Sequence, residues 1–240
     1  MSMNKSIYFL VIIFLFSCEE EEDFSTPFYV DENVVTIKAK DWVTVGTTGV
    51  LNGITYIAID DIKISKSDFQ SKYPEISELK QLVTTLVTDM STLVGDYTLI
   101  GAFDDFKSIE TWDVSNVTNM SGMFDTCNCF NPAYINVENM PDLTYWDVSS
   151  VTNMSGMFSH IYGGAMFNQD ISGWDVSNVT NMAGMFLGNQ YFNQDLSSWD
   201  VSKVTNCNQF SCSFACQWTL PQPNFPISCN SVSYTHLTLP

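Results

Sequence analysis

The chain has 240 residues, 45% of them hydrophobic, and its 27 acidic residues outnumber nine lysines and no arginine, giving a formal net charge of −18. Such an acidic surface repels phosphate backbones, which excludes nucleic acid as a partner. The sequence has no GxSxG, HExxH or P-loop motif, and only one histidine lies outside its last nine residues, so we expect no catalytic residues and no enzyme activity.

The N-terminus predicts a lipoprotein signal peptide over residues 1–17. Lys5 precedes the apolar run IYFLVIIFLF, which is too short for a membrane span, and Leu15 to Cys18 have the pattern of a lipobox. We therefore expect Cys18 to carry a lipid anchor, in which each buried methylene contributes about 0.8 kcal/mol. A plain signal peptide with an incidental cysteine is the alternative.

Residues 18–33 are predicted to form an acidic tether, because the run EEEED from Glu19 to Asp23 is typical of a solvated segment. The same run resembles the acidic export signal that follows the lipidated cysteine in surface lipoproteins of some Gram-negative bacteria. That resemblance implies an exported protein, lipid-anchored at the outer membrane and exposed on the bacterial cell surface.

Residues 34–81 are predicted to form a small β-rich N-terminal cap, built from a hairpin and a helix. Two alternating apolar segments flank Asn52-Gly53, a pair typical of a tight hairpin turn. Ser67 to Thr84 then have the pattern of a polar helix that Pro74 interrupts. A repeat protein needs such a cap to cover its open end.

Residues 82–211 repeat one unit, WDVSNVTNMSGMF, which occupies 112–124 and returns with few changes at 146–158 and 174–186. A partial copy opens at Trp199, and residues 87–94 keep the second half of the unit. The basic period is about 25 residues, with insertions at 125–139 and 159–164. Self-similarity at this period is typical of a solenoid.

Within each unit, the segment x-W-D-V alternates as a strand does, while Val117, Met120, Met123 and Phe124 have helical spacing. The sequence thus predicts the α/β class, as a short leucine-rich-repeat-like solenoid of about five strand-turn-helix repeats stacked on one another. Gly122 weakens the helix, so a single irregular turn is the alternative.

The units and the connectors FNQD at 167–170 and 192–195 resemble the repeat of bacterial BspA-type leucine-rich-repeat surface lipoproteins. The resemblance covers about residues 82–229. It implies a cell-surface protein, with adhesion to host or matrix proteins in some members and no catalytic residues. The two insertions and the small number of repeats depart from the family pattern.

The aspartate of each W-D-V is a candidate binding position, because these carboxylates would lie in a column beside the stacked strands. Carboxylates at strand spacing repel one another unless they accept turn amides, are bridged by calcium or face a ligand. The glycine-rich calcium nonapeptide of other solenoids is absent, which weakens the calcium alternative. The column consists of Asp113, Asp147, Asp175 and Asp200.

The aromatic and methionine columns of the unit have two interpretations. The methionines and phenylalanines repeat with the fold itself and are predicted to form the core. The tryptophans are expected to point inward or, if partly exposed, to stack on sugar rings or anchor a protein partner. These candidate ligand contacts are Trp112, Trp146, Trp174 and Trp199.

Six cysteines remain besides Cys18, and an even number in an exported chain predicts disulfides, with a zinc site as the weaker alternative. The last four are expected to staple a Cys/Pro-rich C-terminal cap at 212–231, whose prolines prevent another regular rung. The six are Cys127, Cys129, Cys207, Cys212, Cys216 and Cys229.

Residues 232–240, VSYTHLTLP, are interpreted as a sequencing-adapter artefact, because their back-translation resembles the end of a library adapter. They carry no structural prediction, and the natural C-terminus stays open.

Two functions are consistent with these predictions. One is a binding or adhesion module on the cell surface that recognises protein or glycan ligands. The other is a structural envelope spacer with no specific ligand. An exposed aromatic patch on one face would favour binding, and a uniformly charged surface would favour the spacer.

Overall fold

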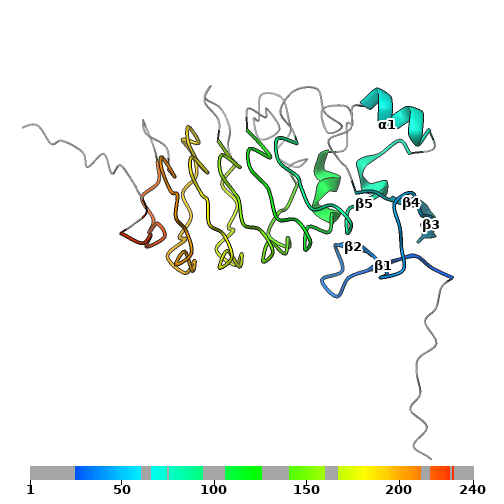
Figure 1. Ribbon diagram of the computed structural model, residues 1–240, viewed down its shortest axis with the longest axis horizontal. Coiled ribbons are helices and arrows are strands. Elements are labelled where there is room, and N and C mark those ends of the chain that lie inside the picture. The colour runs from blue at the N-terminus through cyan, green and yellow to red at the C-terminus, as the bar shows by residue number, and fades with distance from the viewer. Residues whose placement is uncertain are drawn as a thin grey trace, which may run out of the picture.

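The computed structural model describes residues 25–60, 66–74, 76–93, 106–125, 141–159, 167–211, 217–227 and 229. The predicted signal peptide, Cys18, the run from Glu19 to Asp23, most of both insertions and the tail 232–240 lie outside these residues. Figure 1 shows strands and a helix at one end of the molecule, followed by a row of coils that advances towards the C-terminal end.

Two small sheets form the N-terminal part. Strand β1 (Phe28–Val30) pairs antiparallel with β2 (Ile37–Ala39). Strands β3 (Thr48–Leu51), β4 (Ile54–Ala58) and β5 (Leu82–Val83) form the second sheet, in which β3 and β4 are antiparallel and β4 and β5 parallel. Because β1 belongs to a sheet, the folded part begins before the boundary expected at residue 34.

The predicted hairpin is confirmed. Asn52 and Gly53 connect β3 to β4 with φ angles of 52° and 80°. Two successive positive φ angles define the type I′ turn, whose twist matches that of the flanking strands. The Asn-Gly pair therefore fixes the register in which Leu51 faces Ile54.

The helix predicted over residues 67–84 is only partly correct. Helix α1 (Lys66–Lys72) ends before Pro74, and the chain continues as the 3₁₀ turn η1 (Leu79–Gln81) and then as β5. A second 3₁₀ segment, η3 (Phe106–Thr111), precedes the first full repeat. Among the described residues, no helix is long and apolar enough to cross a bilayer.

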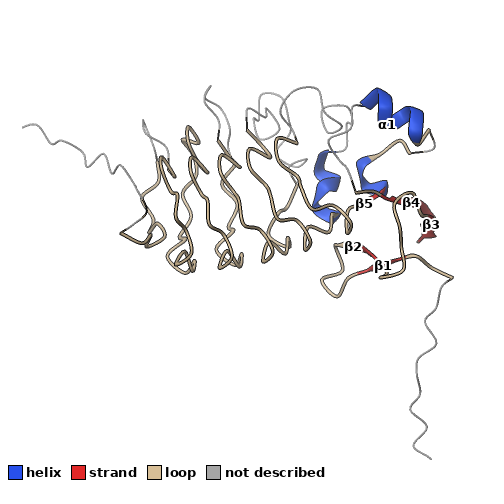
Figure 2. Ribbon diagram, in the orientation of Figure 1, coloured by secondary structure: helices blue, strands red, loops and turns tan. Residues whose placement is uncertain are grey.

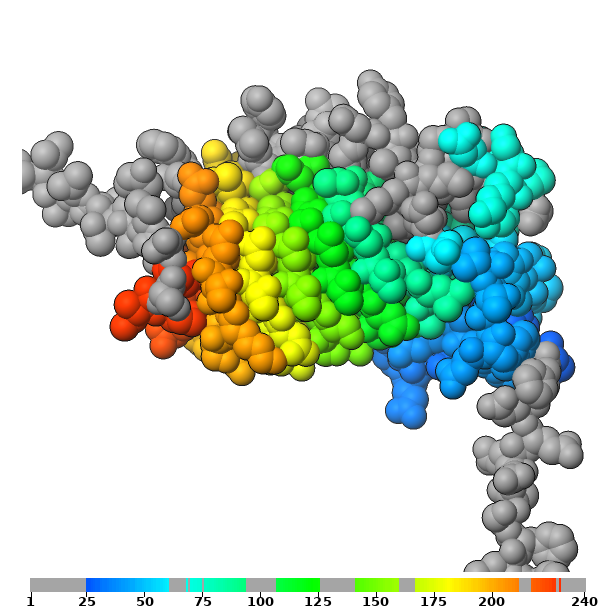
Figure 3. Space-filling model, in the orientation of Figure 1, coloured from blue at the N-terminus to red at the C-terminus, as the bar shows by residue number. Residues whose placement is uncertain are grey.

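The repeats stack as successive coils, one per unit. Isolated parallel bridges join each coil to the next, from Asp89 to Asn119, Asn153, Asn181 and Asn206. The same backbone bonds recur at each step: Met120 N–H donates to the Asn153 carbonyl at 2.9 Å, and Met154 N–H donates to the Asn181 carbonyl at 2.9 Å. The coils form adjacent bands from green to orange in the space-filling view (Figure 3).

The predicted α/β class, with strand-turn-helix repeats, is wrong. Among the described residues, the repeats hold no α-helix and, after β5, no continuous strand, and Figure 2 shows the coils as loop apart from η3. Both regular sheets and α1 lie in the N-terminal part. The regular structure is therefore mostly β, and the coils are runs of turns joined by single bridges.

The reason is that an apolar spacing of three satisfies turns as well as a helix. Val117 N–H donates to the Val114 carbonyl at 2.9 Å, and Met123 N–H donates to the Met120 carbonyl at 3.2 Å, each closing a four-residue turn. The N–H of Met120 itself bonds to the next coil. Gly122 has φ of 58°, which a right-handed helix does not allow.

The predicted core columns of the repeats are confirmed. Phe158 lies 5.4 Å from Phe124 and 5.7 Å from Phe186 between ring centroids, with the rings stacked. Phe167 of the connector stacks on Phe158 at 3.9 Å. The repeat methionines and phenylalanines are at most 3% exposed. They are Met120, Met123, Phe124, Met154, Met157, Phe158, Met182, Met185 and Phe186.

Candidate functional site

The aspartate column caps turns. Asp147, Asp175 and Asp200 are exposed, and each Oδ1 accepts the backbone N–H of the serine two residues later, at 3.0 to 3.1 Å. The backbone N–H and then the hydroxyl of Ser177 hold the pKa of Asp175 below its ordinary value, while the neighbouring Asp200 opposes this. The geometry is that of an Asx turn, the amide-bonded alternative.

Asp113 differs from the rest of the column because the N-terminal part covers it. Strand β2 bridges to the coil through Ile37 and Trp112, and Asp113 is only 2% exposed. Its Oδ1 accepts the N–H and hydroxyl of Ser115 at 3.1 and 2.7 Å, whereas its buried Oδ2 has no hydrogen-bond partner. The four aspartates therefore do not form one continuous exposed column.

No metal centre emerges from the described residues. Among them, no three His, Cys, Asp or Glu side chains gather as ligands, for calcium or for zinc. Each exposed aspartate of the column already uses one carboxylate oxygen in its turn. The only histidine considered in the sequence analysis, His160, lies outside the described residues.

A second row of aspartates, not considered in the sequence analysis, makes the same turn. The Oδ1 atoms of Asp142, Asp170 and Asp195 accept the N–H two residues later at 3.0 Å. The signal was present as D-L/I-S/T before Trp146, Trp174 and Trp199. Hydrogen bonds from the hydroxyl and then the N–H of Ser172 lower the pKa of Asp170, and Ser197 acts likewise on Asp195.

The tryptophan column lies in the core. The four indoles are between 1% and 5% exposed, and each N–H donates to a carbonyl of the preceding turn of chain. This burial leaves no ring face for a ligand. Among the described residues of the repeats, the exposed aromatic side chain is that of Tyr145, which is 51% exposed beside Trp146. The column consists of Trp112, Trp146, Trp174 and Trp199.

A third feature, again missed in the sequence, is an exposed threonine row. Thr152 Oγ1 donates to the Thr118 carbonyl at 3.1 Å, and Thr180 Oγ1 donates to the Thr152 carbonyl at 3.1 Å. Thr118 and Thr205 repeat this bond at 3.2 Å. All four hydroxyls therefore point the same way, with their lone pairs free to accept.

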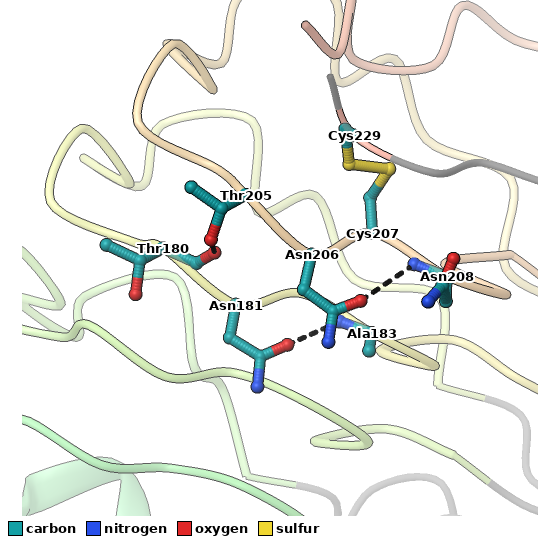
Figure 4. Close-up of a disulfide and its surroundings, with 8 residues drawn as sticks. All are labelled: Thr180, Asn181, Ala183, Thr205, Asn206, Cys207, Asn208 and Cys229. Carbon is teal, nitrogen blue, oxygen red and sulfur yellow. Dashed lines mark hydrogen bonds between the residues drawn. A yellow bond between two sulfur atoms is a disulfide. The ribbon is translucent and has the colours of Figure 1, made fainter. Parts of the chain in front are cut away.

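An asparagine row runs beside the threonines. Asn119, Asn153 and Asn181 Oδ1 each accept the N–H two residues later at 3.1 Å, and Asn206 does so at 3.3 Å. Their amide nitrogens have no partner within the described part of the chain. Figure 4 shows the amides of Asn181 and Asn206 side by side, pointing the same way.

We call these two rows the Thr–Asn face. Its members are Thr118, Thr152, Thr180, Thr205, Asn119, Asn153, Asn181 and Asn206. The segments that carry it contain no charged residue over 115–122, 149–156 and 177–184, although the chain has a net charge of −18. Lys203, at its C-terminal border, donates to Asn178 Oδ1 at 2.6 Å.

The C-terminal end is held by one observed disulfide. Cys207, at the methionine position of the last coil, bonds to Cys229, with their Cα atoms 5.7 Å apart. Figure 4 shows this bond directed away from the Asn206 amide. The prediction of a stapled C-terminal cap is confirmed for this pair. Cys127, Cys129, Cys212 and Cys216 lie outside the described residues.

The fold and this face define a repeat protein made of stacked turns, with small uncharged polar side chains on one side. A family model described as "Mycoplasma protein of unknown function, DUF285" matches residues 64–159 and 131–217, well over half of the chain. The chain belongs to this family. Among curated proteins and among solved structures, no match to the chain is found.

Proposed function

We propose that this protein is a cell-surface lipoprotein of the BspA type that acts as a non-enzymatic binding or adhesion module towards extracellular protein or glycan ligands. Its anchor would be the lipid on Cys18, and the acidic run after it would direct the protein to the outside of the outer membrane. The sequence of the first 23 residues and the family membership support this proposal.

The observation that carries the binding function is the Thr–Asn face. Its hydroxyls and amides are held by bonds to the backbone, so a ligand meets groups that lose little conformational freedom on binding. The face occupies four bridged coils, so at a strand spacing of about 4.8 Å it is roughly 14 Å long. Such a small contact favours binding through many copies on one cell.

The test is binding of the protein, displayed in many copies on beads, to arrays of glycans and extracellular-matrix proteins. A saturable signal that substitutions on the Thr–Asn face abolish would support a binding module. The measurement is repeated with calcium and with a chelator, because calcium dependence would point back to the exposed aspartates. Absence of a signal in both conditions from folded protein would refute adhesion to these ligands.

The envelope spacer is the second candidate, and the burial of the tryptophans favours it. Among the described residues, the large exposed hydrophobic side chains are distributed over both ends and one repeat position rather than gathered on the coils. They are Tyr29, Val34, Val45, Val50, Tyr145, Leu220 and Ile227. The uncharged Thr–Asn face, in contrast, is not the uniformly charged surface that a spacer needs for solubility alone.

A further inference from the structure

We propose that the Thr–Asn face binds a neutral, linear polysaccharide whose chain runs along the row of coils. This inference rests on the proposed binding function and names its ligand class.

The hydrogen-bonding groups suit a ligand rich in hydroxyls. Each threonine hydroxyl donates to the preceding coil and so offers lone pairs outward, as Thr152 does with the Thr118 carbonyl. The side-chain oxygen of each asparagine accepts a backbone N–H, as that of Asn153 does from Ser155, so the two amide N–H groups are left as donors for a ligand. One column therefore accepts and the neighbouring column donates. A sugar hydroxyl can do both at once.

Charge decides between neutral and charged ligands. The face itself is uncharged over three consecutive coils, while the whole chain carries a net charge of −18. The exposed aspartates of the neighbouring column, Asp147, Asp175 and Asp200, lie within the same coils. These negative charges would repel sulfated or uronic acid polymers, whereas they would not repel a neutral polymer.

The spacing suits a polymer rather than a single sugar. The bridges repeat the same pair of groups at every coil, at a strand spacing of about 4.8 Å. The step from one coil to the next is about the length of one sugar residue in an extended polysaccharide. Successive residues of a linear polymer can therefore repeat one set of contacts, and weak single contacts add along the chain.

The test compares the full chain, purified in mild detergent, with a variant that keeps the turns but removes the donors. Asn153→Asp together with Asn181→Asp preserves the oxygen that accepts the N–H, because Asp89 occupies the same position in the first coil and accepts the Ser91 N–H at 2.8 Å. The single variant Asn153→Asp serves if the double variant melts early. Asn224→Asp adds a charge on an exposed residue that is not a member of the Thr–Asn face and is the control.

The probes are cellulose, chitin and neutral β-glucan, with heparin and alginate as charged counterparts. We expect saturable binding to at least one neutral polymer. Binding should be weaker by about tenfold or more in the Asn153 variants, because they lose the amide N–H donors, and should be unchanged in Asn224→Asp. Equal binding by the Asn153 variants overturns the inference. Binding only to heparin or alginate, or to no polysaccharide, also overturns it.

A matrix-protein array run in parallel separates this inference from the proposed function. Binding to a protein with no binding to neutral polymers would refute the polysaccharide ligand and leave the binding module supported. Loss of both signals in a folded sample would refute both.

Discussion

Replacing Gly156 with alanine tests the turn structure of the repeats directly, because a helix and the observed turn predict opposite signs. In a helix, alanine is more favourable than glycine by about 1 kcal/mol. Here Gly156 has φ of 62°, the left-handed region that costs an alanine about 1–2 kcal/mol. We therefore expect Gly156→Ala to lower the free energy of unfolding.

The structure shows that conformation, and not a clash, would cause this loss. A Cβ at Gly156 would lie 3.6 Å from Ser159 Oγ and 3.9 Å from the Gly122 backbone, which is ordinary contact. Gly173 is the matched control, because no positive φ is found there and a Cβ would meet nothing within 4 Å. Gly173→Ala should be neutral or stabilise by up to about 1 kcal/mol, through the unfolded chain.

Urea titrations of both variants give the two free energies, and thermal melts give a second measure. A loss of about 1–2 kcal/mol in a domain of this size lowers the melting temperature by about 2–8 °C. If Gly156→Ala is as stable as the parent or more so, the assignment of left-handed turns in the repeats is wrong, and the helix predicted from the apolar spacing regains support.

Three further outcomes are expected. Trp174→Phe should cost about 1–2 kcal/mol in a urea titration, because the Leu143 carbonyl loses the indole N–H that donates to it at 3.1 Å while an aromatic ring remains. Reducing the bond between Cys207 and Cys229, 22 positions apart, should cost about 3 kcal/mol and lower the melting temperature in dithiothreitol. Serine hydrogen bonds lower the pKa of four aspartates in the folded chain. The stability that these bonds contribute is therefore complete above the ordinary aspartate pKa of 3.8 and is lost as the pH falls through the lowered pKa values of the folded chain. Thermal melts at a series of acidic pH values should show this loss. The four aspartates are Asp170, Asp175, Asp195 and Asp200.

Each of these has a control. Tyr145→Phe removes an exposed hydroxyl and should leave stability unchanged, so an equal loss in both variants would contradict the role assigned to the indole N–H. Dithiothreitol should have no effect on a Cys207→Ala, Cys229→Ala variant. Replacing Ser202 with alanine should raise the pKa of Asp200, because the hydroxyl of Ser202 is the main group that lowers it.

The sequence was sufficient for the repeats, their core and the hairpin, because each depends on a pattern with one physical solution. Burial of Met154 and Phe158 follows from their return in all three full units, and Asn52-Gly53 has few other uses between apolar segments. The helix prediction failed because apolar residues at every third position suit both a helix and a series of turns. Only the carbonyl partners of residues such as Met120 decide between them.

The Thr–Asn face could not be predicted because its function depends on which atoms are left over. Thr180 and Asn181 have side chains that the sequence allows to cap, to bond one another or to face solvent. In the structure the Thr180 hydroxyl donates to the Thr152 carbonyl, and the Asn181 oxygen accepts the Ala183 N–H. These bonds determine which lone pairs and amide hydrogens are left for a ligand. The tryptophans show the converse, because a sequence alternative for ligand contact disappears once the rings are buried.

The disulfide at the last coil also determines how the protein responds to mechanical load. A pull applied beyond Cys229 passes through the sulfur bridge and reaches the coils at Cys207, so the residues between the two cysteines are shielded from extension. The load then falls on the bonds to the preceding coil, first those from Met182 and Gly184 to the carbonyls of Asn206 and Asn208. Because each coil is bonded only to its neighbours, the molecule should yield one coil at a time under tension, with longer steps for the units that carry insertions.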